Sequence, residues 1–234
     1  MKIEAVDLSF AYSRAGFCLR HINFCMESGE AAALTGPNGS GKTTLGKLLC
    51  GLLKPQGGAV RFDGEDTANW SLGRRGQRIG YLFQEPARQL FAPTVLEDLT
   101  FTQELAGAAP EEARARAMEL LARFELASLA QRGTLTLSRG EQQRLAICGL
   151  LLNKPGAIVL DEPTTGLDAR RKEILSQAIQ EVLQSGTSVL LISHDAPFVR
   201  QNASREVKME ALTKAPFACE GGGPQDRGEP NAKT

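Results

Sequence analysis

Hydrophobic and polar positions divide the chain into three regions, and the first of them has the pattern of strands. The runs "IEAVDLSFAY" and "FCLRHINFCM" are β-like and are separated by "SRAG", as in a hairpin. The apolar run "AAALTG" predicts a buried strand that ends in a glycine-rich loop, and "AVRFDG" and "IGYLFQ" predict two more strands. After the loop, helical spacing predicts a helix with one apolar face, formed by Leu45, Leu48, Leu49 and Leu52.

The middle region has a helical period. From Val95 to about Leu129 the pattern is helical, and a Pro that suits a helix start precedes a stripe of Ala113, Ala117, Leu120, Leu121 and Phe124. A further helix is expected to begin at Ser138, which is a good N-cap, because Glu141 lies three residues later and completes a capping box. We therefore expect a helical subdomain over residues 95–152 or so.

The last third returns to alternating strands and helices. The runs "AIVLDEP" and "SVLLISH" predict buried strands on either side of a helix that stops near Gly186. This alternation favours a parallel sheet. After Pro216 the chain is polar and rich in Gly and Pro, so we expect an ordered domain over residues 1–215 and a disordered tail over residues 216–234.

Composition narrows the function classes. The chain has 234 residues, of which 42% are hydrophobic and 23% are charged, as in an ordinary soluble globular protein. Lys+Arg and Asp+Glu are both 27, so nothing indicates broad electrostatic binding to nucleic acid. No signal-peptide core and no apolar run long enough to span a bilayer are visible. Any membrane role is therefore expected to come through a partner.

The stretch "GPNGSGKT" fits the phosphate-loop pattern. Its glycines let backbone N–H groups wrap the phosphates of a nucleotide, the Lys supplies a positive charge, and the Thr hydroxyl can ligate Mg²⁺. A strand before it and a helix after it make a plain glycine-rich turn a poor alternative. The predicted nucleotide-binding residues of this segment are Gly36, Pro37, Asn38, Gly39, Ser40, Gly41, Lys42, Thr43 and Thr44.

Carboxylates and a histidine follow two of the predicted buried strands. Asp161 ends one strand and can hold the hydration shell of Mg²⁺, while Glu162 can orient or deprotonate an attacking water. The alternative is an acidic helix cap or loop pair. His194 follows the next strand, and strand C-termini in such sheets face the ligand crevice, so we expect it near the γ-phosphate. A lone strand-end His is otherwise most often satisfied by backbone groups.

Two other residues are weak signals by themselves. Gln84 ends a predicted strand, where a Gln is more often a solvated loop residue. The ring of Tyr12 could stack on a base, but taken alone the residue is better explained as an ordinary core or surface aromatic. The start of the helix at Ser138 raises a separate question, because Gly140 is a poor residue within a helix. A helix start built from small residues suits an anion that comes close to the backbone.

Taken in order, "GPNGSGKTT", Gln84, "LSRGEQQRLAI", "IVLDEPTTGLD" and His194 resemble the motifs of ATP-binding subunits of ABC transporters. The resemblance covers roughly residues 3–209. It implies an α/β fold, namely a P-loop NTPase core with an antiparallel β subdomain and an inserted helical subdomain. It also implies ATP and Mg²⁺ as ligands, with Thr43, Gln84 and Asp161 at the metal.

The resemblance also implies a role for each matching residue. Tyr12 is similar to the adenine-stacking aromatic, Glu162 to the catalytic carboxylate and His194 to the switch histidine, while Gln84 resembles the Gln that senses Mg²⁺ and the membrane subunit. In the family, a signature helix start binds the ATP held by a second, head-to-tail protomer, and a nearby Asp lies in a loop that crosses the dimer interface. The matching residues are Ser138, Arg139, Gly140, Glu141 and Asp168.

A longer stretch, "FQEPARQLFAPTVLEDLTF", is similar to energy-coupling-factor ATPases, which drive uptake of vitamins or transition-metal ions. This likeness implies a peripheral subunit on the cytoplasmic face of the membrane. Its partners would be a second ABC ATPase subunit, a transmembrane coupling subunit and a substrate-binding membrane subunit, with no nucleic acid beyond ATP. Leu90, Phe91 and Val95 are expected to form an exposed socket for a partner helix, unless they only pack the helical region.

Departures from the family pattern keep alternatives open. Arg139 and Glu141 replace a Gly and the Gln of the usual L-S-G-G-Q signature, and Arg139 either reaches the γ-phosphate or points to solvent. The segment after His194 lacks the glycine-rich turn of the family, which leaves the dimer contacts open. One rival function is a poorly hydrolysing partner subunit, although Glu162 and His194 are both present. The other is a non-transport ABC ATPase, which would carry long heptad runs that are not seen here.

Overall fold

The structure is a computed structural model that describes residues 1–12 and 17–212. The predicted disordered tail lies outside the described residues. Nine strands form two sheets within the described ranges, with the order β2-β1-β4-β5 in one and β6-β7-β8-β3-β9 in the other. The strands are β1 (Ile3–Ala11), β2 (Cys18–Met26), β3 (Ala31–Thr35), β4 (Gly57–Phe62), β5 (Glu65–Asp66), β6 (Ile79–Leu82), β7 (Ala157–Asp161), β8 (Ser188–Ile192) and β9 (Arg205–Lys208).

The first sheet is antiparallel and contains the predicted N-terminal hairpin. In the register of β1 and β2, Ile3 pairs with Met26 and Ala11 pairs with Cys18. On its other edge β1 pairs with β4. The second sheet is parallel throughout its described strands, as the strand–helix–strand alternation predicts. The structure therefore confirms a mixed α/β fold with one antiparallel and one parallel sheet.

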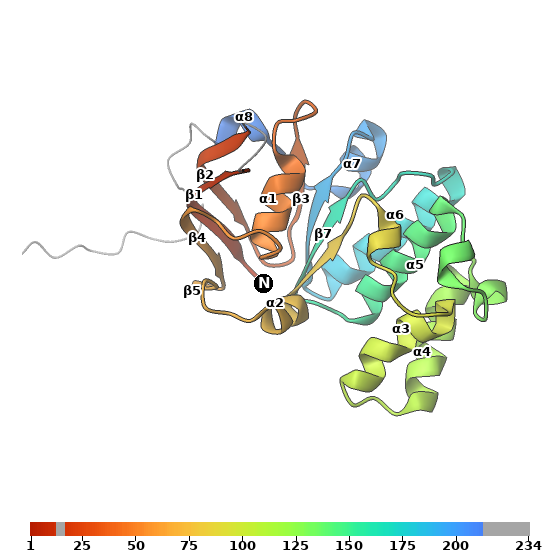
Figure 1. The fold of residues 1–234 in the computed structure, drawn as a ribbon. Helices are drawn as coiled ribbons and strands as arrows, with labels where there is room; N and C mark the ends of the chain where they lie inside the picture. The colour runs from red at the N-terminus through yellow and green to blue at the C-terminus, as the bar shows by residue number, and fades with distance from the viewer. Residues whose placement is uncertain (13–16, 213–234) are drawn as a thin grey trace, which may run out of the picture.

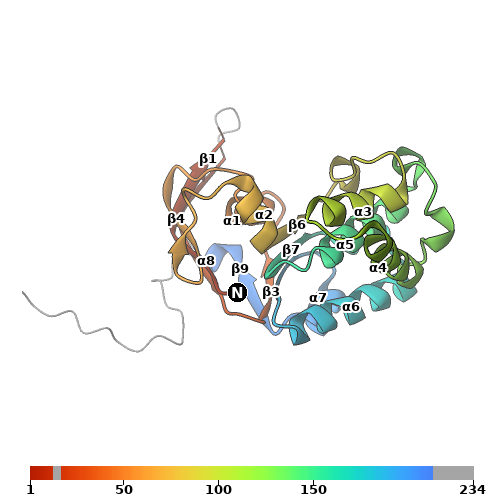
Figure 2. The same cartoon turned by 90° about the horizontal axis from the view of Figure 1, so that it is seen from below.

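The helices cover the parallel sheet from both sides (Figures 1 and 2). Helix α1 lies between the two sheets, whereas α5 and α6 cover the opposite face. The strand β7 shows why, because successive side chains of a strand point to opposite faces: Val159 packs with the α1 side and Leu160 with the α5 and α6 side. The helices are α1 (Lys42–Leu49), α2 (Leu72–Arg78), α3 (Val95–Leu105), α4 (Pro110–Arg123), α5 (Arg139–Leu152), α6 (Ala169–Gln184), α7 (Ala196–Asn202) and α8 (Met209–Leu212).

Helices α3 and α4 lie together at the end of the molecule far from β1 and β4, and α5 joins them to the parallel sheet (Figures 1 and 2). The first and third of these helices begin with a complete capping box. In α5 the pair is Ser138 and Glu141, as the sequence predicts. In α3 the pair is Thr94 and Glu97, which was not predicted.

Several local features differ from the sequence-based expectations. Helix α1 ends at Leu49, so Leu52 lies beyond its apolar face and is 44% exposed. Helix α2 was not predicted, because none of its residues is buried and it therefore has no apolar stripe. The short edge strand β9 was also missed, since only Val207 of its four residues is buried.

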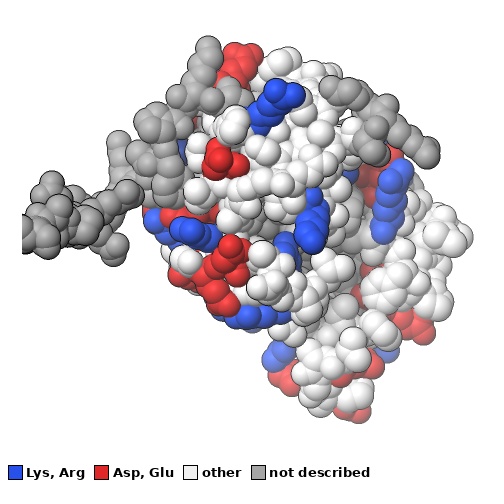
Figure 3. Space-filling model, turned by 60° about the vertical axis from the view of Figure 1, so that its left-hand side comes forward, with Lys and Arg blue, Asp and Glu red and all other residues white. Residues whose placement is uncertain are grey.

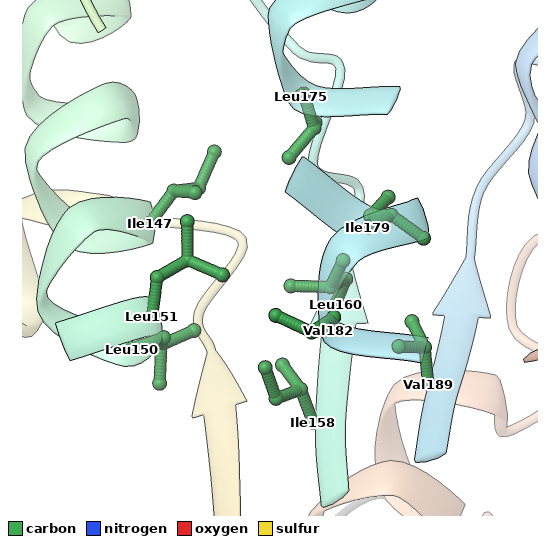
Figure 4. A pocket seen from close by; sticks show the side chains of 9 residues that line it. All are labelled: Ile147, Leu150, Leu151, Ile158, Leu160, Leu175, Ile179, Val182 and Val189. Atoms are coloured by element: carbon green, nitrogen blue, oxygen red, sulfur yellow. The ribbon is translucent and has the colours of Figure 1, made fainter. Parts of the chain in front are cut away.

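A small apolar cavity of about 10 Å³ lies where α5 and α6 meet the sheet (Figure 4). Ile147, Leu150 and Leu151 of α5 face Leu175, Ile179 and Val182 of α6 across it, over side chains of β7 and β8. The cavity has no polar lining, and an apolar void of this size stays dry. We interpret it as a packing gap in the core.

On the face shown in Figure 3, acidic and basic side chains are interspersed, which agrees with the zero net charge of the chain. Among the helices of the described residues, none is both long enough and apolar enough to cross a lipid bilayer.

Candidate functional site

The phosphate-loop residues lie between the end of β3 and the start of α1. Backbone geometry explains the glycines: Gly39 has φ 77° and Gly41 has φ 100°, a region that costs little only for Gly. At Gly41, which is the N-cap of α1, a Cβ atom would also lie 2.6 Å from Leu19 and 2.8 Å from Phe17. Any other residue type there would have to displace the ends of these two side chains.

Two polar side chains of this loop fit an anion. Lys42 is buried, and its Nζ donates to the carbonyl oxygens of Gly36 and Pro37 at 2.8 and 3.0 Å. Within the part of the chain that the structure describes, no carboxylate pairs with this ammonium group. The Ser40 Oγ is buried and also has no hydrogen-bond partner there. A bound phosphate would satisfy both groups, because an unpaired buried charge or hydroxyl is costly.

The predicted metal residues fit Mg²⁺. Asp161 is 1% exposed, and among the described residues no Lys, Arg or His forms an ion pair with it. Its Oδ2 accepts a hydrogen bond from the Tyr81 hydroxyl at 2.8 Å. The described residues hold no group of three or more His, Cys, Asp or Glu suited to a metal. A single carboxylate with Thr43 and Gln84 on the same cleft suits Mg²⁺, which keeps waters and nucleotide oxygens as its other ligands.

Glu162 and His194 lie together next to this carboxylate. Glu162 Oε1 is 3.6 Å from His194 Nε2, and its Oε2 accepts weaker contacts from the backbone N–H of His194 at 3.4 Å and from Ser193 Oγ at 3.5 Å. The backbone of Glu162 has φ 52°, an unfavourable value for a residue other than Gly, and its N–H bonds to Ile192 O at 2.7 Å. Such strain is held by the surrounding sheet and is typical of functional sites.

Most of these residues share one open cleft of about 780 Å³, although its lining does not include Gly36, Pro37 or Ser40. It lies at the C-terminal ends of β3, β7 and β8, where ligands bind in sheets of this kind. Predicted residues that line it are Tyr12, Asn38, Gly39, Gly41, Lys42, Thr43, Thr44, Gln84, Arg139, Asp161, Glu162 and His194. Phe17, Thr165 and Ile192 line it too and were not predicted.

Tyr12 stands at the rim of the cleft and is 37% exposed. Its ring packs edge-on against Phe10, with 4.9 Å between the centroids, and lies 6.3 Å from Phe17. An exposed aromatic face beside a phosphate loop can stack on a base. Phe17 carried no motif in the sequence, so only the fold of the hairpin could place it here.

The signature residues have a different location. Ser138, Gly140, Glu141 and Asp168 do not line this cleft, although Arg139 does, as an exposed side chain in the first turn of α5. Hydrogen bonds from Ser138 lower the pKa of Glu141, which keeps the capping box charged. Gly140 also has a reason within the chain, because a Cβ there would lie 2.9 Å from the carbonyl oxygen of Gly166.

Asp168 caps α6 and is tied to the same helix. Its Oδ1 accepts from the backbone N–H of Arg171 at 2.9 Å, and its Oδ2 pairs with the Arg171 guanidinium at 3.0 Å. The turn before Asp168 lies beside the start of α5, because Gly166 in this turn closely approaches Gly140.

The prediction that three apolar residues form an exposed socket is wrong for two of them. Leu90 is 9% exposed and Val95 is fully buried, and both pack in the core of the helical region. Phe91 is 58% exposed and forms an edge-to-face pair with Phe101, which is 51% exposed, with 5.2 Å between the ring centroids. Buried Asp98 holds the turn, since its Oδ1 accepts from the backbone N–H groups of Phe91 and Ala92.

Comparisons with known proteins identify the family and the fold of the chain. A family model described as ABC transporter matches residues 19–165. An energy-coupling factor transporter ATP-binding protein, EcfA, of Methanothermobacter thermautotrophicus is 41% identical over 205 residues, which are 87% of this chain and 66% of the relative. An ABC transporter ATP-binding protein of Caldanaerobacter subterraneus subsp. tengcongensis is 37% identical over 207 residues, which cover 88% of this chain and 36% of the relative. The chain therefore spans less than two thirds of the length of these two relatives.

Solved structures share the fold. A dimeric ATP-binding cassette in a post-hydrolysis state, bound to ADP and Pi, has a TM-score of 0.80 at 28% identity and covers 88% of this chain and 93% of its own. The cbiO1 protein of Clostridium perfringens, described as part of the ABC transporter complex cbiONQ, has a TM-score of 0.74 at 30% identity, covering 88% of this chain and 83% of its own.

Proposed function

The chain belongs to the ABC transporter family, and from this premise we propose that it is the ATP-binding and ATP-hydrolysing subunit of an energy-coupling-factor transporter. The observation that carries the proposal is the single cleft that collects the phosphate loop, Asp161, Glu162 and His194 at the ends of three parallel strands. The similarity to EcfA over 87% of the chain supports the transporter type. The substrate would be a vitamin or a transition-metal ion, chosen by a separate membrane subunit.

In this cleft each residue has a chemical task. Lys42 and the loop N–H groups hold the phosphates, Tyr12 stacks on the adenine, and Thr43, Gln84 and Asp161 hold Mg²⁺. A Mg²⁺ ion held there would supply positive charge next to the phosphate oxygens. Glu162 orients or deprotonates the attacking water, and His194, whose Nε2 is 3.6 Å from Glu162 Oε1, contacts the γ-phosphate.

The remaining motif residues act on a second ATPase subunit, identical or not. Ser138, Gly140 and Asp168 lie outside the cleft of their own chain, which supports a role at the ATP of a head-to-tail partner. The start of α5 offers backbone N–H groups and the positive end of a helix dipole to that ATP. ATP then closes the pair, and hydrolysis reopens it and moves the membrane subunits.

The membrane partner docks on the exposed Phe91–Phe101 pair. Two exposed aromatic rings in contact form an apolar surface, to which Phe101 of α3 and Phe91, just before the helical subdomain, each contribute one ring. We place this subdomain at residues 95–152 within a domain of residues 1–215. Residues 84–91, which include a 3-10 helix at Pro86–Arg88, connect Gln84 to Phe91 along the chain. A partner helix seated on Phe91 would act on Gln84 through this segment. The protein would therefore lie on the cytoplasmic face of the membrane as a peripheral subunit.

Cysteine crosslinking tests the proposal. A Phe91→Cys variant, co-expressed with the transmembrane subunits, should crosslink to one of them, whereas Leu72→Cys on α2 should not. Leu72 is a matched control because it is 69% exposed and lies on α2, which is apart from α3, the helix that carries Phe101 (Figures 1 and 2). Equal crosslinking at both positions, or none at position 91, would contradict the proposed docking surface.

A further inference from the structure

Tyr81 is a buried tyrosine beside the carboxylate assigned to Mg²⁺. It lies in β6, which pairs in parallel with β7, so that Tyr81 is opposite Val159 and its hydroxyl reaches Asp161 two residues further along. The side chain is 6% exposed, and the distance from its hydroxyl to Asp161 Oδ2 is 2.8 Å. No motif of the sequence assigned a role to this residue.

The ring of Tyr81 is fixed by its neighbours. It packs edge-to-face on Phe83, with 5.0 Å between the ring centroids. Gly46 of α1 is also close to the ring, since an added Cβ there would be 3.3 Å from it and similarly close to Val159 and Ile192. A side chain held between a helix and its own strand has little rotamer freedom, so its hydroxyl is presented at a defined point.

The carboxylate of Asp161 has little else to orient it. In the described ranges, the Tyr81 hydroxyl gives the one hydrogen bond to this side chain, and no cationic side chain pairs with it. A bond to Oδ2 restricts rotation of the carboxylate and leaves Oδ1 without a protein donor. Partners of this kind around a metal ligand set its orientation, and removing them typically lowers metal affinity about 10–100-fold.

We propose that Tyr81 is a positioning residue for Mg²⁺, in that its hydroxyl holds the Asp161 carboxylate in the orientation that receives the Mg²⁺ of Mg–ATP. The inference rests on the proposed function and deepens it. Tyr81 does not touch the nucleotide cleft, whose lining includes Asp161 but not Tyr81, so its action is indirect. It follows that nucleotide affinity without metal does not depend on the Tyr81 hydroxyl. The gain in affinity that Mg²⁺ provides does depend on it.

The test is Tyr81→Phe in the 234-residue chain, with displacement of a fluorescent ATP analogue measured in excess EDTA and then over a Mg²⁺ titration. We expect the affinity in EDTA to stay within about twofold and the half-saturating Mg²⁺ concentration to rise about 10–100-fold. Tyr81→Phe in an Asp161→Asn background should add little further change, because the two side chains act as one unit. An unchanged Mg²⁺ response, or an equal loss of affinity with and without Mg²⁺, would overturn the inference.

Ser176→Ala is the matched control, because it removes another buried hydroxyl bond, from Ser176 Oγ to Asn202 Oδ1 at 2.7 Å, between α6 and α7. It should lower thermal stability without altering the Mg²⁺ response. A Mg²⁺ response that shifts equally in Ser176→Ala would show a general stability effect and would contradict a specific role for Tyr81. Failure of the unmodified chain to bind ATP would instead refute the proposed function itself.

Discussion

The turn that carries Phe91 depends on one buried carboxylate, and replacing it gives a graded prediction. Asp98 is 8% exposed, and its Oδ1 accepts from Phe91 N at 2.9 Å and from Ala92 N at 3.0 Å. Hydrogen bonds to a charged group contribute about 1.5–3 kcal/mol each. Burial opposes them, since desolvation raises the pKa of Asp98 against the lowering effect of these two bonds. We therefore expect Asp98→Ala to lower the free energy of unfolding by about 2–4 kcal/mol.

Asp98→Asn is the control that separates hydrogen bonding from charge. Its amide oxygen can still accept both N–H bonds and avoids the desolvation cost of a carboxylate, so its loss should be about 1 kcal/mol or less. Urea denaturation measures the loss of unfolding free energy in both variants, provided that the dependence of this free energy on urea concentration has the same slope as in the unmodified protein. Equal destabilisation by Ala and Asn would refute the view that accepted hydrogen bonds hold this turn.

The unmodified protein and Asp98→Asn should also differ in how their stability depends on pH. The folded-state pKa of Asp98 is raised above its usual value, so the folded protein binds this proton more readily than the unfolded chain does. The stability that this proton contributes is fully present below the pKa of Asp98 in the unfolded chain. It is lost as the pH rises through the higher pKa of Asp98 in the folded protein. The stability of the unmodified protein relative to Asp98→Asn should therefore fall as the pH rises from about 4. A difference that grows with pH would contradict this reasoning.

Other substitutions test separate parts of the account. Lys42→Ala should abolish most of the nucleotide affinity, because its ammonium group faces the phosphates, and an unchanged titration curve would refute that role. Arg139→Gly should change ATPase activity only a few-fold: helix propensity favours Arg by about 0.8–1 kcal/mol, while its charge opposes the helix dipole by about 0.3–1 kcal/mol. If Arg139→Gly, which restores the usual Gly of the signature, activates an otherwise inactive complex, the signature of this chain does not support hydrolysis. Ile179→Ala should cost about 2–5 kcal/mol in urea denaturation, since the 2% exposed side chain lines an existing cavity; a loss below about 1 kcal/mol would contradict this.

Local sequence patterns were sufficient to predict those parts of the site that are formed by residues close together in the chain. The phosphate loop, the strand that ends at Asp161 and the capping box of Ser138 and Glu141 are each defined within about ten residues, and the structure has these elements where the sequence predicts them. Glu162 and His194 could be brought together in advance only through the general rule for the ends of parallel strands.

Contacts that depend on packing between distant elements could not be predicted. The bond between Tyr81 and Asp161 joins residues 80 positions apart and requires the register of β6 with β7. The burial of Leu90 and Val95 depends on how α3, α4 and α5 pack, which no periodicity near residue 90 reveals. Gly140 was interpreted through a bound anion alone, whereas its contact with Gly166 requires the turn before α6 to fold against α5.

ATP hydrolysis by Glu162 is the central claim, and one substitution tests it directly. The chain should be purified through a tag from solubilised membranes, so that partner subunits accompany it, in unmodified form and as Glu162→Gln. Because the amide keeps the shape of the side chain but cannot activate water, we expect ATP binding to persist and steady-state turnover to fall by about 10²–10⁴-fold. Size-exclusion chromatography of the variant with Mg–ATP should show a stabilised ATPase pair. Undiminished turnover by Glu162→Gln would contradict the account.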